Sequence, residues 1–80
     1  MMSAFVFVTV ADMTGASDVA TIHKALHAVP GVKTVYFVAG PTDVICFVEA
    51  ADQAGLMECV GKIHAVKGVA RTDTRIVLPS

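Results

Sequence analysis

The sequence has 80 residues, of which 55% are hydrophobic and 16% are charged, and its formal net charge is -1. Its lysines and arginines are scattered, so no basic patch is present to bind a nucleic-acid backbone, and no apolar run approaches the roughly 20 residues of a membrane-spanning helix. We therefore expect a soluble, cytoplasmic protein that forms one domain over residues 1–80. A chain this short buries only about 60% of the surface that its unfolded form exposes. Because its composition is so apolar, we predict that other copies of the chain cover the apolar surface that remains exposed.

The first predicted element is a strand over Ala4–Val10 that is apolar on both of its alternating faces. A strand with one face in water would alternate apolar with polar residues, so we expect this strand to be covered on both sides. A loop follows, and Ser17 is expected to cap a helix. The apolar stripe of this helix has the spacing of three and four residues. Its members are Val19, Ile22, Leu26 and Val29, and Pro30-Gly31 ends the helix.

Residues 34–50 contain two strongly apolar runs that meet at Gly40-Pro41-Thr42-Asp43. The runs are rich in β-branched and aromatic side chains, which favour strands, and the turn combines a glycine, a proline and a carboxylate. A β-hairpin is therefore predicted. Within it, the side chain of Tyr36 is expected on the opposite sheet face from Val35 and Phe37. There it would pack at a subunit contact or, alternatively, line a pocket.

The second half of the chain repeats the helix and strand. Asp52 is expected to cap a helix with an apolar stripe of Leu56, Val60 and Ile63, and Gly68 to end it. Residues 69–78 then return as a strand in which Thr72, Thr74, Ile76 and Leu78 share one face.

An internal repeat supports this division. Residues 22–32 resemble residues 60–69, and the two align best at the pattern His-Ala-Val-x-Gly-Val. The order β-α-β-β-α-β predicts an α+β, ferredoxin-like fold, with a four-stranded antiparallel sheet and both helices on one face. The other face would meet a second copy of the same sheet.

These elements together resemble a known family. The residues that carry the resemblance are the apolar first strand, the corner Val29-Pro30-Gly31-Val32, the turn Gly40-x-x-Asp43 with its following strand, and the closing Thr72-x-Thr74. They resemble the effector-binding (RAM) domain of the Lrp/AsnC family of leucine-responsive and asparagine regulators. Because the first strand begins within a few residues of Met1, the resemblance is to the stand-alone domain, without the helix-turn-helix that binds DNA.

The resemblance implies dimers that associate through their sheets in the manner of a dimeric α/β barrel, and rings of such dimers. It also implies a small amino-acid effector bound between dimers near the hairpin turn. A full-length regulator of the same family is a further possible partner. No cofactor, metal or catalytic residue is expected.

The expected ligand-binding residues are Gly40, Thr42, Asp43, Thr72 and Thr74. Backbone amides of the turn would bind the effector's carboxylate, and the Asp43 side chain would accept from its ammonium group. The two threonines, carried over from the family motif, would add hydroxyl contacts from a neighbouring subunit. Alternatively, Asp43 simply braces the local backbone, and the threonines are ordinary strand residues.

Two other pairs of residues are candidate sites. His23 and His27 stand four residues apart on one helix face and could chelate a metal, but no third ligand is evident, so we expect exposed imidazoles at the rim of the core. Cys46 and Cys59 match no metal or redox motif. We expect buried, reduced thiols, with a disulfide between them as the alternative.

Three functions are therefore compatible with the sequence. The first is a non-enzymatic, amino-acid-binding oligomer that reports its ligand to a partner. The second is a small dimeric enzyme, isomerase-like or monooxygenase-like, with a cavity around a histidine inside each subunit. The third is an assembly partner without a ligand. A cavity within one subunit around a histidine would favour the enzyme, and one between dimers beside Asp43 would favour the sensor.

Overall fold

The computed structural model describes residues 1–11, 16–38 and 43–78, and of residues 16–18 it describes the backbone alone. Six elements follow one another in the predicted β-α-β-β-α-β order. They are β1 (Met2–Val10), α1 (Ala16–His27), β2 (Val32–Phe37), β3 (Val44–Ala50), α2 (Gln53–His64) and β4 (Val69–Ile76). None of the helices in the described part of the chain is long and apolar enough to cross a membrane.

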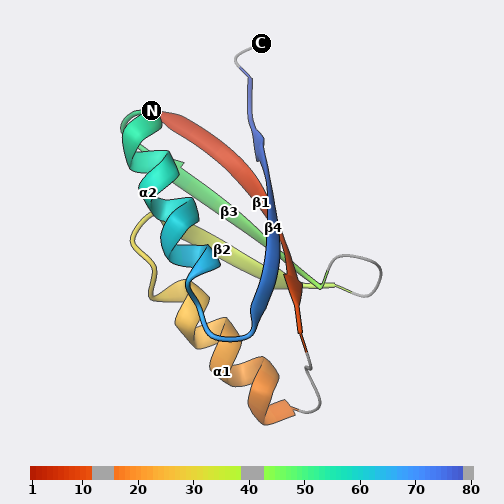
Figure 1. The fold of residues 1–80 in the computed structure, drawn as a ribbon. Coiled ribbons are helices and arrows are strands. Elements are labelled where there is room, and N and C mark those ends of the chain that lie inside the picture. Colours follow the sequence, from red (N-terminus) through yellow and green to blue (C-terminus); the bar gives the residue numbers. More distant parts are fainter. Residues whose placement is uncertain (12–15, 39–42, 79–80) are drawn as a thin grey trace.

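The four strands form one antiparallel sheet in the order β2-β3-β1-β4, and both helices cover the same face of it (Figure 1). This arrangement confirms the predicted ferredoxin-like fold. The two strands with the most continuous apolar sequence, β1 and β3, lie in the centre of the sheet. In its middle, Val6 of β1 pairs with Cys46 of β3 on one side and with Thr74 of β4 on the other.

The hydrophobic core fills the space between the sheet and the helices. Alternate residues of β1 and β3 point into it, as the period of two along a strand requires. These are Ala4, Val6, Val8 and Val10 from β1, and Val44, Cys46 and Val48 from β3. Leu26 of α1 and Leu56 and Ile63 of α2 are fully buried opposite them. No helix of the described residues covers the other face of the sheet, which we call the open face (Figure 1).

The internal repeat corresponds to two equivalent corners, each of which leads a helix into a strand. Gly31 and Gly68 occupy the same position in the two corners, with φ of 98° and 99°, a region that side chains disfavour. Three backbone hydrogen bonds recur in each. They are Ala28 N to Lys24 O, Val29 N to Leu26 O and Val32 N to Val29 O in the first corner, and Ala65 N to Gly61 O, Val66 N to Ile63 O and Val69 N to Val66 O in the second.

Both helix starts were predicted, and one prediction was wrong. Asp52 caps α2 as expected, since its side chain accepts a hydrogen bond from Gly55 N at 2.8 Å. In contrast, α1 begins at Ala16, so Ser17 lies inside the helix and not at the capping position before it.

Three smaller differences between prediction and structure concern the end of the first helix, the buried residues of the second helix and the end of the last strand. The first helix ends at His27, so Val29 packs into the core from the corner, because the residue before a proline is disfavoured in helical conformation. In α2, Cys59 is buried more fully than Val60, which packs at the edge of the core. The last strand ends at Ile76, two residues earlier than predicted, although Val77 N still donates to Ser3 O at 2.9 Å.

Candidate functional site

Of the five expected ligand-binding residues, the structure describes three. Gly40 and Thr42 lie outside the described residues. Asp43 lies directly before β3, at the end of the sheet where β1 finishes, and its backbone joins both neighbouring strands. Its amide donates to Val8 O at 3.2 Å, and its carbonyl accepts from Val38 N at 3.0 Å.

The side chain of Asp43 also binds the protein itself. Its Oδ2 accepts a partly buried hydrogen bond of 2.9 Å from Val10 N, 33 residues away in the sequence. The ladder between β1 and β3 ends at the pair Val8 and Val44, so the Val10 amide has no β3 residue opposite it. The carboxylate satisfies this amide, which would otherwise lose its hydrogen bond at the edge of the core. The bracing role is therefore present in the single chain, and the ligand role of Asp43 stays a prediction.

Thr72 and Thr74 lie on β4, opposite Val8 and Val6 of β1, and both are half-buried. Residues opposite each other in a ladder share a face, so these threonines lie on the helix side of the sheet. Because β1 separates Thr72 from β3, its backbone lies two strand spacings, or about 10 Å, from that of Val44. One chain therefore does not bring Thr72 against Asp43.

The open face carries large apolar side chains on three strands and charged ones on the fourth. The strand registers place on it Phe5, Phe7, Tyr36, Ile45 and Phe47 from β1, β2 and β3, and Arg71, Asp73 and Arg75 from β4. The rings of Phe5 and Phe47 lie 5.1 Å apart, and the Arg75 guanidinium lies 5.7 Å from the ring centre of Phe7. Phe5 is 40% exposed and Tyr36 is 56% exposed. The expected orientation of Tyr36, opposite to the buried Val35, is thus confirmed.

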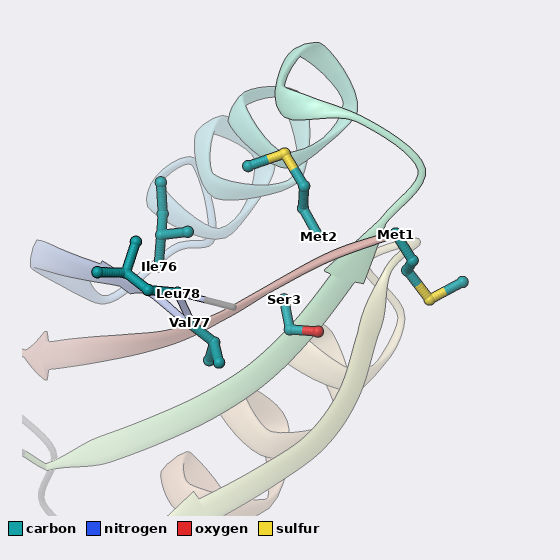
Figure 2. A pocket seen from close by; sticks show the side chains of 6 residues that line it. All are labelled: Met1, Met2, Ser3, Ile76, Val77 and Leu78. Atoms are coloured by element: carbon teal, nitrogen blue, oxygen red, sulfur yellow. The ribbon is translucent and has the colours of Figure 1, made fainter. Parts of the chain in front are cut away.

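A cavity of about 400 Å³ lies at the other end of the sheet, where β1 starts and β4 ends (Figure 2). It is lined by Met1, Met2, Ser3, Ile76, Val77 and Leu78. Figure 2 shows Met2 and Ile76 pointing towards the side of the sheet that carries α2. This cavity was not predicted, although apolar residues at both chain ends were the available signal. It lies about 27 Å from Val10 along β1, away from Asp43 and lined by none of the three histidines.

Both cysteines are buried and free, which confirms the expectation of reduced thiols. Burial, together with a smaller contribution from Cys59 nearby, raises the pKa of Cys46 to about 11; burial also raises the pKa of Cys59. The thiolate is the reactive form of cysteine. At neutral pH these residues therefore act as small hydrophobic side chains and supply no nucleophile.

Comparison with known proteins connects these features to a family. Residues 3–80 match the family described as the Lrp/AsnC ligand binding domain, in agreement with the resemblance noted in the sequence. The crystal structure of TTHA0845 from Thermus thermophilus is similar with a TM-score of 0.83 and 28% identity, and the match covers 100% of this chain and 96% of that one.

Two further matches are to longer proteins. The feast or famine regulatory protein Rv3291c from M. tuberculosis, complexed with L-methionine, is similar with a TM-score of 0.79 and 28% identity, over 100% of this chain and 52% of that one. A homocitrate synthase from Sulfurisphaera tokodaii is 40% identical over 57 residues, which is 71% of this chain and 12% of that protein. The chain thus spans about half of the regulator's length and a small part of the synthase.

Proposed function

Because the chain belongs to the Lrp/AsnC ligand-binding domain family, we propose that it binds a free amino acid, or a similarly small effector, in a cleft between copies of itself. The observation that carries this proposal is the family match over residues 3–80. The similar regulator Rv3291c is complexed with L-methionine, which supports an amino acid as the ligand.

In this proposal the open face is the surface through which two copies pair. Its exposed aromatic side chains would leave water on pairing, and burial of apolar surface stabilises association by roughly 25 cal/mol per Å² before the costs of association are subtracted. A two-fold pair uses the same patch on both copies. Pairs would then assemble further into rings, as the family resemblance implies.

The effector would bind where the hairpin turn of one copy approaches β4 of another. Gly40 would leave the main chain of the turn open to close approach, and the backbone amide of Thr42 would receive the carboxylate of the effector. Since Val10 N occupies Oδ2 of Asp43, the ammonium group would be accepted at Oδ1. Thr72 and Thr74 would contribute hydroxyl groups from the neighbouring copy.

Two kinds of partner would respond to such binding, and a different match supports each. The likeness to half of a regulator supports mixed assembly with a full-length regulator of the family. The 40% identity to a segment of homocitrate synthase supports control of an enzyme that carries the same domain. In either case the effector would act by changing which copies associate, because it binds between them.

An enzyme with its own intra-subunit cavity is the alternative, and less supports it. The cavity at the start of β1 has an apolar lining without any histidine, and the two cysteine thiols are buried and protonated at neutral pH. The described residues thus do not supply the histidine-centred cavity that this alternative requires.

A thermal-shift screen of the common amino acids tests the proposal most directly. A ligand that binds the folded oligomer alone stabilises it by about 2.7 kcal/mol when present at a hundred times its dissociation constant. For a domain of this size such a gain raises the melting temperature by roughly 10 °C or more. We expect such a rise with one or a few L-amino acids, L-methionine among the candidates. The matching D-amino acid is the control, and we expect no comparable rise with it.

The absence of any shift with every amino acid at millimolar concentration would contradict the proposal. An equal shift with the L- and D-forms would also contradict it, because a site that holds the carboxylate, the ammonium group and the side chain of the effector distinguishes the two. To separate the two kinds of partner, the chain is mixed with a full-length regulator or with the synthase, and co-elution is measured with and without the effector.

A further inference from the structure

We propose that His23 and His27 together bind a divalent transition-metal ion of the borderline class, such as Zn²⁺, Ni²⁺ or Cu²⁺. The proposal is independent of effector binding, because the two histidines are on α1 and take no part in the effector site described above. Both belong to the same face of this helix, since residues four apart lie one turn above each other.

The separation of the two rings is that of a chelating pair. Their centroids lie 4.9 Å apart, with 51° between the ring planes. A metal lies about 2.0–2.1 Å from a histidine nitrogen and hence about 3.2 Å from the centre of that ring. Two such ligands at an angle between about 100° and the tetrahedral value place the ring centres about 5 Å apart. The observed spacing of the ring centres is therefore compatible with one ion held by both imidazoles.

The surroundings hold one ring in place and leave the other accessible. His23 is half-buried and stacks on Phe37 of β2, with 5.7 Å between ring centres and 26° between ring planes. His27 is exposed, so an ion can reach the pair from solvent. A ring already fixed by packing loses less conformational freedom on binding than a mobile one.

Both imidazoles are also available as ligands. Neither forms a hydrogen bond or an ion pair with another residue in the described part of the chain. Lys24 follows His23 directly and therefore projects about 100° away around the helix. No cluster of three or more histidine, cysteine or acidic residues forms a metal site within residues 1–11, 16–38 and 43–78. Water or the histidines of a second copy would thus complete the coordination.

The chemistry of the donors selects the class of ion. Imidazole nitrogen suits Zn²⁺, Cu²⁺ and Ni²⁺, whereas Mg²⁺ and Ca²⁺ require oxygen ligands. A site with two protein ligands binds more weakly than a closed four-ligand zinc site. Bound metal would also stabilise the packing of α1 against β2, because the ring of His23 on α1 stacks on Phe37 of β2.

Calorimetric titration of the full chain with Zn²⁺ tests this proposal, and the chain offers a matched control. His64 stands at the position of His27 in the internal repeat, is exposed and is preceded four residues earlier by Val60 instead of a histidine. We expect saturable binding of one ion per chain, or per two chains if copies share it. His27→Gln should weaken binding at least about tenfold, whereas His64→Gln should leave it unchanged, since a single imidazole is a much weaker ligand than a chelating pair.

Thermal melting supplies a second readout. Zn²⁺ should raise the melting temperature of the unmodified chain and of the His64→Gln variant, but not of the His27→Gln variant. The proposal is overturned if the unmodified chain shows no saturable binding, if His27→Gln binds as tightly as the unmodified chain, or if His64→Gln weakens binding as much as His27→Gln does. Because His27 is exposed, its replacement should leave the fold intact, which circular dichroism verifies.

Discussion

At position 43 a single carboxylate completes the hydrogen bonding between the end of β1 and the start of β3. The partner is Val10 N, whose strand runs on past its last pairing with β3. An effector bound at this place would meet a negative charge that the fold already holds in position. The same residue can therefore brace the sheet and contribute to recognition, and substitution can separate the two roles.

Replacement of Asp43 by Ala removes the partner of a partly buried amide. We expect the free energy of unfolding to fall by about 1–3 kcal/mol, the usual cost of an unsatisfied buried donor. Asp43→Asn keeps a side-chain oxygen that can accept from Val10 N, so its cost should be smaller. Urea unfolding of the two variants, at one protein concentration, measures the difference. Equal stability of Asp43→Ala and the unmodified chain would contradict the bracing role.

The asparagine variant also tests the ligand role. If the charge of Asp43 binds the ammonium group of an effector, Asp43→Asn should fold normally but lose the thermal shift that the effector produces. If Asp43 is a brace alone, the variant should keep the full shift.

At the scale of elements, the two corners after α1 and α2 have the same backbone conformation. Gly31 and Gly68 have nearly the same positive φ, but their surroundings differ. A Cβ at Gly31 would lie 3.0 Å from Glu49 O and 3.2 Å from Cys59 Sγ, whereas at Gly68 the nearest atom, at 3.3 Å, is the flexible end of Ile22. The first corner is therefore packed against backbone, and the second against a side chain that can move.

A series of glycine-to-alanine variants tests this difference between the corners. Gly68→Ala should cost about 1–2 kcal/mol because of its φ. Gly31→Ala should lower the free energy of unfolding by about 1 kcal/mol more than Gly68→Ala does, or by a larger amount. The reason is that the Glu49 carbonyl cannot move away from the new Cβ without straining β3. Denaturant unfolding compares the variants.

Gly61 provides the control within the same series. It lies in α2 with nothing within 4 Å of an added Cβ. Gly61→Ala should thus stabilise the chain by up to about 1 kcal/mol, the helix-propensity difference between the two residues. A Gly31→Ala variant as stable as Gly68→Ala would show that the contact with Glu49 does not matter.

At the scale of the whole molecule, one sheet face is packed and the other is bare. Both helices cover the first face (Figure 1). On the open face, the side chains of Phe5 and Tyr36 are exposed to solvent. Exposed apolar surface lowers the stability of so small a chain, so the open face is the place where a second copy would add most to stability.

Phe5→Glu tests pairing through the open face. Phe5 lies in the middle of this face, beside Arg75 of β4, whose guanidinium already forms an ion pair with Asp73 at 3.0 Å. We expect the dissociation constant of the dimer to rise at least about tenfold, which corresponds to about 1.4 kcal/mol. Analytical ultracentrifugation over a range of concentrations measures this change.

Met57→Lys is the control on the helix layer, which lies on the opposite side of the sheet from the open face. Met57 is 46% exposed on α2, away from the open face. Its replacement should leave the dimer intact if pairing uses the sheet. Loss of the dimer in this variant but not in Phe5→Glu would place the interface on the helices. A single-subunit mass for the unmodified chain would rule out pairing through either face.

Much of the fold could be predicted because its signals are local. The order of the six elements followed from runs of β-branched residues, from spacing of three and four, and from glycines at corners. The cap at Asp52 and the orientation of Tyr36 followed in the same way. The start of α1 could not, because both Ala16 and Ser17 are compatible with a helix start, and sequence alone does not rank them.

The candidate site was less predictable. A family resemblance drew attention to the hairpin turn and to the two threonines. It did not show that Asp43 binds Val10, or that β1 lies between Thr72 and β3. Both facts depend on the register of strands that are far apart in the sequence. The ring spacing of His23 and His27 likewise required coordinates, because four-residue spacing allows several rotamers.

The sequence by itself determined which segments are strands and helices, which residues are apolar enough to be buried, and which family the chain resembles, because these properties depend on the side chains of one short segment at a time. The tertiary structure alone decided which amide meets the Asp43 carboxylate, which face of the sheet is left bare and where a cavity forms. These depend on strand order and register, which arise from contacts between distant segments and which no local pattern specifies.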